Sequence, residues 1–331
     1  MENSTRNEVV SKVSSESSIN PSNKKTSFSL AKIRELIGHN KRLDLFFAVL
    51  GLVSLGIAIL AFVVLFAEMA IAGYARLNPD FFTNFPSRRA ASAGILSAWV
   101  GSLLVMIVTG ATAIPLGIAS GVYLEEYARK NIITDIIEIN VSNLAGVPSI
   151  VYGLLALGVF VYAFGFGQSV LTAGLTLGLL ILPIVIVATR EAIRAIPQHI
   201  REGAYGLGST KWQVTRHHII PYSAPGILTG VIIGMSRAIG ETAPIITIGA
   251  LTFIAFLPDS PLSATAPFIN FEWLKSGFTV MPIQMFNWTS RPEEAFQRNA
   301  AAAGFVLVLM TLGMNAIAIW IRYRLRKTIK W

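Results

Sequence analysis

Arg237 and Glu241 stand four positions apart inside a long apolar segment, residues 224–257. On an α-helix this spacing puts both side chains on one face, within reach of each other. Because a lone charge at the bilayer centre costs roughly 2.5–3.5 kcal/mol on insertion scales, ionisable residues at that depth usually face a cavity and mark a substrate path. The pair therefore indicates an anion pathway. The alternative is a self-neutralising pair that locks a helix bundle, although buried pairs contribute little net stability.

A guanidinium offers a planar fork of N–H donors that suits an oxyanion such as phosphate, and it stays charged at physiological pH. Glu241 would hold Arg237 in place when the site is empty and weaken the site enough to let the anion leave, since conduction requires weak binding. Ser236 and Thr242 are candidates for additional hydroxyl donors on this pathway. Arg190 is a candidate for the exit route, with an ordinary anchor at the membrane surface as the alternative.

Other chemistries find no support in the residue types. The chain has no Cys, which excludes disulfides and thiolate metal sites. His199, His217 and His218 have no acid or Cys partner at metal-site spacing, so we expect no metal. No Gly-Lys dipeptide occurs, so the phosphate-cradling loop of ATPases cannot form. We expect no catalytic residue and no cofactor in this chain.

The chain has a composition that is too apolar for a soluble domain, with 53% hydrophobic and 14% charged residues and a mean hydropathy of +0.60. A membrane span needs about 20 apolar residues. Uncharged or nearly uncharged runs of that size predict six spans, with the third run divided at the turn-like cluster 164–168. The runs are 45–67, 90–124, 139–189 (two spans), 224–257 and 299–321.

Six spans put both ends of the chain on one side. Of the 27 Lys and Arg residues, 20 fall on the side of the termini and six on the other, with Arg237 in the membrane. This distribution predicts cytoplasmic termini and explains the net charge of +9 as a topology signal, so no nucleic-acid partner is expected. Segment 125–138 carries four acidic residues although it falls on the side of the termini, but acidic residues contribute little to this orientation rule.

The predicted organisation has three parts. Residues 1–43 form a basic cytoplasmic tail, disordered over 1–29. Residues 30–41 are a candidate for an interfacial helix on lipid headgroups, with a solvated linker as the alternative. Residues 44–323 form the six-span domain, with a cytoplasmic loop at 190–225 and an external loop at 258–297. Residues 324–331 form a basic cytoplasmic tail.

The loop 190–225 is longer and more polar than a connection requires. Pro197 can begin a helix and Gly208 can end it. Residues 210–213 then have the form of a capping box for a second helix that stops near Pro221. Two short helices at an angle suggest a docking element for a soluble partner, with an ordinary folded loop as the alternative. Apolar side chains are available on it: Ala204, Leu207, Trp212 and Val214.

This loop resembles the EAA loop of ABC-importer permeases, whose pattern is Glu-Ala-Ala, three residues, Gly, nine residues, Ile-x-Leu-Pro. Here Glu202, Ala204, Gly208 and Pro221 fall in register. The chain departs from the pattern with Gly203, His218 and Ile220. The resemblance implies that the loop sits in a groove of an ATP-hydrolysing subunit, which itself binds the ATP. The motif and the apolar side chains of the hairpin together predict these residues for the coupling: Glu202, Gly203, Ala204, Leu207, Gly208, Trp212 and Pro221.

Three further segments resemble the PstA-type permease subunit of phosphate-specific ABC importers over roughly residues 45–325. They are 146–161 (GVPSIVYGLLALGVFV), 237–245 (RAIGETAPI) and 281–288 (MPIQMFNW). The resemblance implies an all-α permease of the type I importer (MetI-like) fold in the inner membrane, with an Arg and a Glu of this motif in the translocation path. It also implies phosphate as cargo and several partners: a PstC-type permease, a dimer of PstB-type ATPases and a PstS-type binding protein.

Two alternatives remain open from the sequence. Arg donors alone do not distinguish phosphate from sulfate, molybdate or a phosphonate. A membrane scaffold that reports phosphate status without moving it would also have a docking loop.

Overall fold

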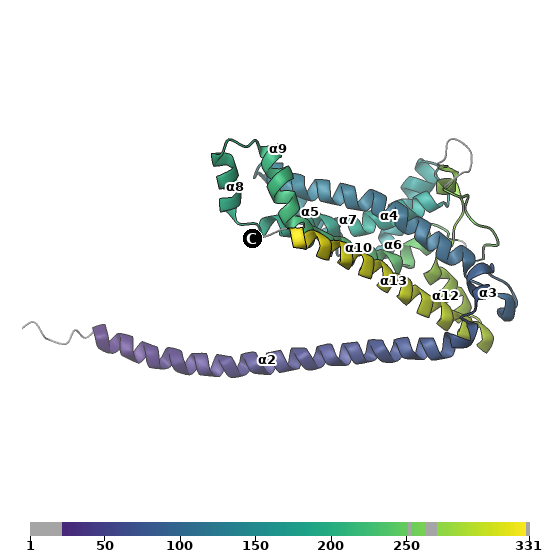
Figure 1. Cartoon of the computed structure of the whole chain (residues 1–331), viewed down its shortest axis with the longest axis horizontal. Helices are drawn as coiled ribbons and strands as arrows, with labels where there is room; N and C mark the ends of the chain where they lie inside the picture. The colour runs from purple at the N-terminus through teal and green to yellow at the C-terminus, as the bar shows by residue number, and fades with distance from the viewer. Residues whose placement is uncertain (1–21, 251–252, 262–269, 329–331) are drawn as a thin grey trace, which may run out of the picture. The chain divides into compact units, whose positions relative to one another are not determined.

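The computed structural model describes residues 22–250, 253–261 and 270–328, and within these ranges the regular structure is helical throughout (Figure 1). The residues form two compact units, 1–66 and 67–331. The α-helices are α2 Ser22–Gly73, α3 Pro79–Thr83, α4 Leu96–Val122, α5 Ile132–Leu144, α6 Ser149–Ala156, α7 Val170–Arg194, α8 Gln198–Gly206, α9 Lys211–Val214, α10 Ile220–Ile239, α11 Ala243–Thr247, α12 Met281–Thr289 and α13 Glu294–Thr328.

The first unit consists of most of α2. Its apolar part, Leu43–Arg76, is long enough to cross a membrane and contains the expected first span. The helix begins at Ser22, so residues 22–29, expected in a disordered tail, are helical, and the expected interfacial segment 30–41 is part of the same helix. Residues 1–21 of that tail lie outside the described residues.

In the second unit, α4 and α7 pack closely and run parallel. A Cβ added to Gly117 would meet Val185, and one added to Gly121 would meet Thr189. Near the other end of the pair, Gly174 lies against Val108 in the same way. Small residues on one stripe permit this approach of two helices in a membrane. These glycines therefore form the packing faces between α4 and α7.

The parallel arrangement settles the number of crossings. Among the described residues, five helices are long and apolar enough to span a membrane, and α5 with the helical segment 149–163 forms a pair bent by 105°. Because α4 ends where α7 also ends, the chain must return across the whole layer between them, so the bent pair serves as the third span. The expected division of run 139–189 is confirmed at Gly165 and Gly167, which both adopt a positive φ.

Helix α10 runs antiparallel to α7 along the stripe Gly226, Gly230 and Gly234, whose added Cβ atoms would meet Ala192, Ala188 and Ile181 in turn. The helix ends at Ile239, although the sequence predicted a span over 224–257. Of the remainder, only α11 is α-helical among the described residues. Since Gly234 is level with Ile181 and α10 continues to Ile239, α10 ends level with the first half of α7, within the thickness of the bundle.

Pro221 does not stop the helix that precedes it, which corrects the prediction. Lys211–Ile239 is a continuous helical run, with a π-helical turn at Thr215–Ile219 directly before α10. A proline lacks an N–H and clashes with the carbonyl four residues earlier. A π-helical turn changes the backbone hydrogen bonding before the proline, so Pro221 can lie at the start of α10 without ending the helical run Lys211–Ile239.

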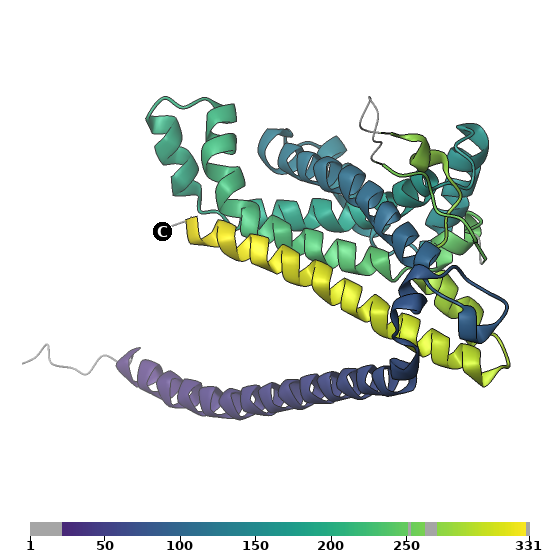
Figure 2. The same cartoon turned by 45° about the vertical axis from the view of Figure 1, so that its right-hand side comes forward.

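The end of the second unit that lies away from α8 and α9 consists of α3, α12 and the start of α13. Within the expected external loop 258–297, α12 is a helix with buried side chains, including Met281 and Trp288, and it packs on α13. Residues 262–269 of that loop lie outside the described ranges. Helix α13 passes along α10 and extends to Thr328, through most of the expected C-terminal tail 324–331 (Figure 2).

Candidate functional site

Arg237 lies in the last turn of α10, and Glu241 follows the end of the helix. Arg237 Nε donates to Glu241 Oε1 over 3.4 Å, so the predicted pairing is present. The Arg237 side chain is 40% exposed and that of Glu241 is 19% exposed. The two Nη groups of Arg237 have no acceptor among the described residues, which leaves N–H donors available to an anion. The pair therefore lies at the broken end of a helix rather than in the middle of one.

The break falls at Gly240, ahead of Pro244. Pro244 lies in the first turn of α11, where its missing N–H would be unpaired in any helix. The unwound segment between the two helices carries Glu241 and Thr242. Non-helical backbone at membrane depth is tolerated where protein buries it or where it lines a water-filled cavity.

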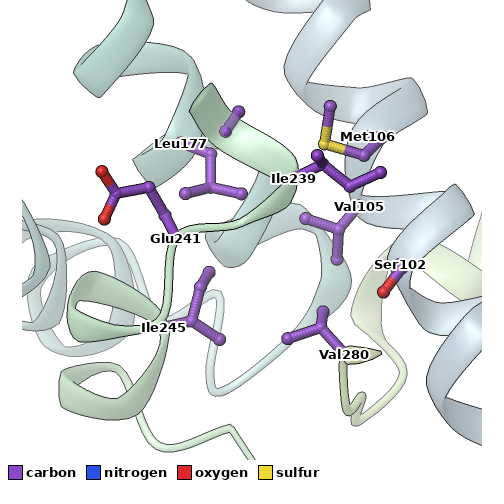
Figure 3. A pocket seen from close by; sticks show the side chains of 9 residues that line it. Ser102, Val105, Met106, Leu177, Ile239, Glu241, Ile245 and Val280 are labelled. Carbon is purple, nitrogen blue, oxygen red and sulfur yellow. The ribbon is translucent and has the colours of Figure 1, made fainter. Parts of the chain in front are cut away.

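A small cavity adjoins Glu241, but its shape and lining do not make it an anion route. Its volume is about 10 Å³, enough for about one water, and its lining is mostly apolar. Figure 3 shows the Glu241 carboxylate pointing away from this cavity. Helix α4 supplies Ser102, Val105 and Met106 to the lining.

The two hydroxyl candidates differ in their availability. Ser236 donates to Asn315 of α13 over 2.6 Å and is bonded to Ile232 O as well, so it joins two helices of this subunit. This contact engages the Ser236 hydroxyl within the subunit, and the expectation that Ser236 serves an anion stays a prediction. Thr242 is half-buried beside Glu241 and makes no capping hydrogen bond to α11. Thr242 remains a candidate donor.

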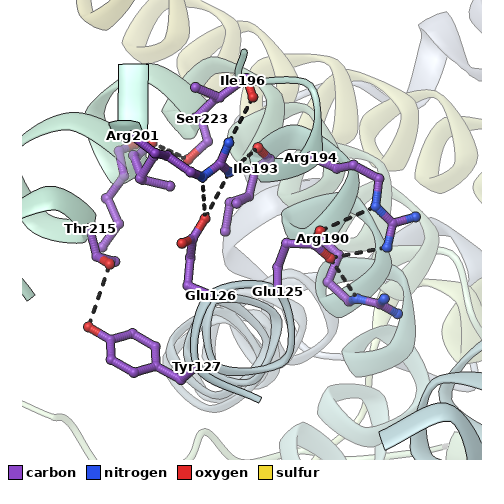
Figure 4. Close-up of polar contacts among 12 residues, drawn as sticks. Glu125, Glu126, Tyr127, Arg190, Ile193, Arg194, Ile196, Arg201, Thr215 and Ser223 are labelled. Atoms are coloured by element: carbon purple, nitrogen blue, oxygen red, sulfur yellow. Dashed lines mark hydrogen bonds and ion pairs between the residues drawn. The ribbon is translucent and has the colours of Figure 1, made fainter. Parts of the chain in front are cut away.

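Arg190 is buried in an ion cluster, which fits neither an exposed anchor nor an open exit site. Its Nε lies 3.5 Å from Glu125, and its Nη2 pairs with Glu138 of α5. Glu125 also accepts from Arg194 over 3.1 and 3.3 Å (Figure 4). The cluster joins the end of α7 to α5 and to the π-helical turn Tyr123–Tyr127 that extends α4.

A second ion pair lies beside this cluster. Arg201 of α8 donates from Nε and Nη2 to Glu126 Oε1, over 3.1 and 2.8 Å. The same guanidinium donates to Ile193 O and Ile196 O, the carbonyls at the end of α7. These contacts were not predicted from the sequence. The sequence features that could have indicated these ion pairs are the excess of acidic residues in segment 125–138 and the arginines in segment 190–201.

The α8–α9 hairpin has the predicted construction. Helix α8 starts after Pro197, Gly208 adopts φ +83° beyond its end, and both bonds of the Thr210–Gln213 capping box are formed. The exposed candidates are Glu202, Gly203, Leu207, Gly208, Trp212 and Pro221. Leu207 is 90% exposed and suits a docking contact.

Two side chains expected to be available on the hairpin are not. Ala204 and Val214 are buried in a small core with Ile193 and Ile219. The core exists because each short helix needs an apolar face to pack against the base of the bundle. Ala204 therefore holds the hairpin together and offers no surface to a partner.

The chain shows clear likeness to known proteins. The family model described as "Binding-protein-dependent transport system inner membrane component" matches residues 113–331. The probable ABC transporter permease protein YqgI of Bacillus subtilis (strain 168) is 31% identical over 278 residues, which cover 82% of this chain and 92% of that protein. The phosphate transport system permease protein PstA of Mycobacterium leprae (strain TN) is 32% identical over 232 residues, covering 70% and 71%.

A solved structure shares the fold. The chain matches a structure titled as inward-facing conformations of the MetNI methionine ABC transporter, with a TM-score of 0.51 and 15% identity, over 70% of this chain and 94% of that one. Together with the apolar helices, these likenesses confirm the MetI-like, all-α fold and the multi-pass membrane class predicted from the sequence.

Proposed function

Since the chain belongs to the family of binding-protein-dependent transport system inner membrane components, we propose that it is the subunit of an ABC importer that carries phosphate across the cytoplasmic membrane. Relatives from several bacteria are named phosphate transport system permease protein PstA. The observation that carries the proposal is the Arg237 guanidinium at the end of α10, partly exposed and with both Nη groups available. The anion chemistry of that group agrees with the cargo in those names.

Arg237 binds the passing phosphate through charge-assisted N–H donors. Its bond to Glu241 is long at 3.4 Å, so an incoming oxyanion can displace the carboxylate. The same carboxylate repels the bound anion and limits the strength of the site, which a transporter needs for release. Thr242 adds a hydroxyl from the unwound segment. A homologous PstC-type permease across the pathway contributes the remaining donors, because one arginine cannot surround a dianion.

Energy comes from partner subunits. The α8–α9 hairpin projects from one end of the bundle (Figure 2) and presents Leu207 and Trp212 to a partner. We place this end in the cytoplasm, together with both termini, where each hairpin docks into one copy of a PstB-type ATPase that binds the ATP. A PstS-type binding protein delivers phosphate on the other side. Closure of the ATPases moves the hairpin and opens the Arg237 region to the two sides in turn.

Reconstitution of the complete importer in liposomes tests this function. We expect ATP-dependent uptake of radiolabelled phosphate that unlabelled phosphate competes and sulfate does not. Replacing Arg237 by Gln removes donors to a charged ligand, which are worth about 1.5–3 kcal/mol each, so uptake should fall about tenfold or more. The matched control is Arg298→Gln, which removes an exposed guanidinium from the start of α13. Competition by sulfate would show that the importer does not select phosphate. Normal uptake by the Arg237→Gln variant would show that Arg237 is not part of the pathway.

A further inference from the structure

Three consecutive residues at the end of α4, Glu125 to Tyr127, contact three different parts of the docking region (Figure 4). Glu125 pairs with Arg190 and Arg194 of α7. Glu126 pairs with Arg201 of α8, as described above. These three residues are called the Glu-Glu-Tyr hub below.

Tyr127 completes the hub from the side of α9. Its hydroxyl lies 3.5 Å from the Thr215 hydroxyl, and Lys211 Nζ lies 5.1 Å from the centre of its ring. The three residues lie on the π-helical turn and contact α7, α8 and α9 respectively. The end of α4 is therefore held by α7, α8 and α9 at once.

The contact between Glu126 and Arg201 is the most enclosed part of the hub. The Glu126 side chain is 7% exposed and that of Arg201 is 18% exposed. Arg201 also satisfies carbonyls at the end of α7, which carry the negative end of the helix dipole. Separating α8 from α4 would leave a buried carboxylate and helix-end carbonyls without their donor. The hairpin base and the end of α4 should therefore move together.

Helix α4 connects the hub to the candidate anion site. Val105 and Met106, near its middle, line the cavity beside Glu241. From Met106 to Glu126 is 20 residues, or about 30 Å of helix. Close packing on α7 at Gly117 and Gly121 stiffens the part of α4 between the two ends. One continuous helix thus contacts both the hairpin and the residues around Glu241.

We propose that Glu126 and Arg201, within the Glu-Glu-Tyr hub, are positioning residues that couple movement of the α8–α9 hairpin to α4 and so to the Arg237–Glu241 segment. The proposal rests on the proposed function in that the hairpin docks an ATPase, but it does not depend on the cargo. The proposal gives a role to Glu126, which belongs to the acidic segment 125–138 that did not fit the charge-based orientation rule.

The test uses the complete importer and a reporter thiol, Ile246→Cys, on the exposed face of α11 next to Glu241. The chain has no native cysteine, so the thiol is its only one. We expect ATP to change the rate at which a maleimide labels this thiol. In Glu126→Gln the ATP-dependent change should shrink about fivefold or more, the lower end of common coupling energies. The matched control, Glu191→Gln, removes an exposed acid that pairs with Arg194 on the same helix end and should leave the response intact.

A cross-linking experiment tests the same coupling if the Glu126→Gln variant fails to assemble with the ATPase. Tyr127→Cys and Thr215→Cys put two thiols at the hub while Glu126 and Arg201 remain. Joining them with a short bifunctional thiol reagent should leave ATP hydrolysis and phosphate uptake unchanged, because the joined parts move as one. A bridge that stops both activities would overturn the proposal, as would an unchanged labelling response in Glu126→Gln.

Failure of the proposed function gives a different result. If phosphate is not the cargo, the unmodified complex takes up none, yet the Ile246→Cys labelling still responds to ATP and still depends on Glu126.

Discussion

Two arginine–glutamate pairs in this chain have similar lengths but opposite environments, and they predict different energetic consequences. Arg201 lies 2.8 Å from Glu126, with side chains 18% and 7% exposed. Arg298 lies 2.6 Å from Glu294, with side chains 59% and 77% exposed. Removing one partner of a buried pair leaves an uncompensated charge and costs about 3–5 kcal/mol. An exposed pair four residues apart on a helix is worth only about 0.3–0.5 kcal/mol.

We therefore expect Arg201→Met to lower the free energy of unfolding by about 3–5 kcal/mol and Arg298→Met by less than about 1 kcal/mol. Denaturant titration of the two variants in the same detergent micelles measures both values. The chemical change is identical, so the comparison tests the combined effect of burial and of the two helix-end carbonyls that Arg201 also binds. Equal losses in the two variants would refute the argument that enclosure makes the Glu126–Arg201 contact strong.

Three glycines give further predictions. Gly230→Val should cost about 1–3 kcal/mol in the same titration, because even a Cβ would collide with Ala188 and push α10 from α7; no loss would mean that the helices are not packed there. Gly203→Ala should instead gain about 0.5–1 kcal/mol, since it lies in α8 with open space around it, and a loss of stability would contradict this helical placement. Gly208→Ala should strain the hairpin turn at φ +83° by about 1–2 kcal/mol and reduce co-purification of the ATPase, which a pull-down from detergent extract measures; unchanged recovery would speak against this turn as part of the docking element.

The sequence alone determined those features that depend on local chemistry. Apolar run lengths predicted the spans because a bilayer requires about 20 residues whatever the neighbours are. Pro197, Gly208 and the Thr210–Gln213 capping box predicted the hairpin because each acts on its own backbone. The spacing of Arg237 and Glu241 predicted their pairing for the same reason.

Tertiary structure decided which side chains face a partner, a cavity or a neighbouring helix. Ala204 looked available in the sequence, yet it is buried in a core that includes Ile193, and the Ser236 hydroxyl, a predicted pathway donor, binds Asn315. Glu126 meets Arg201 across 75 positions of sequence, and only the close packing of α4 on α7 brings the two together. Local signals fix backbone conformation, whereas contacts between distant residues depend on how the helices pack.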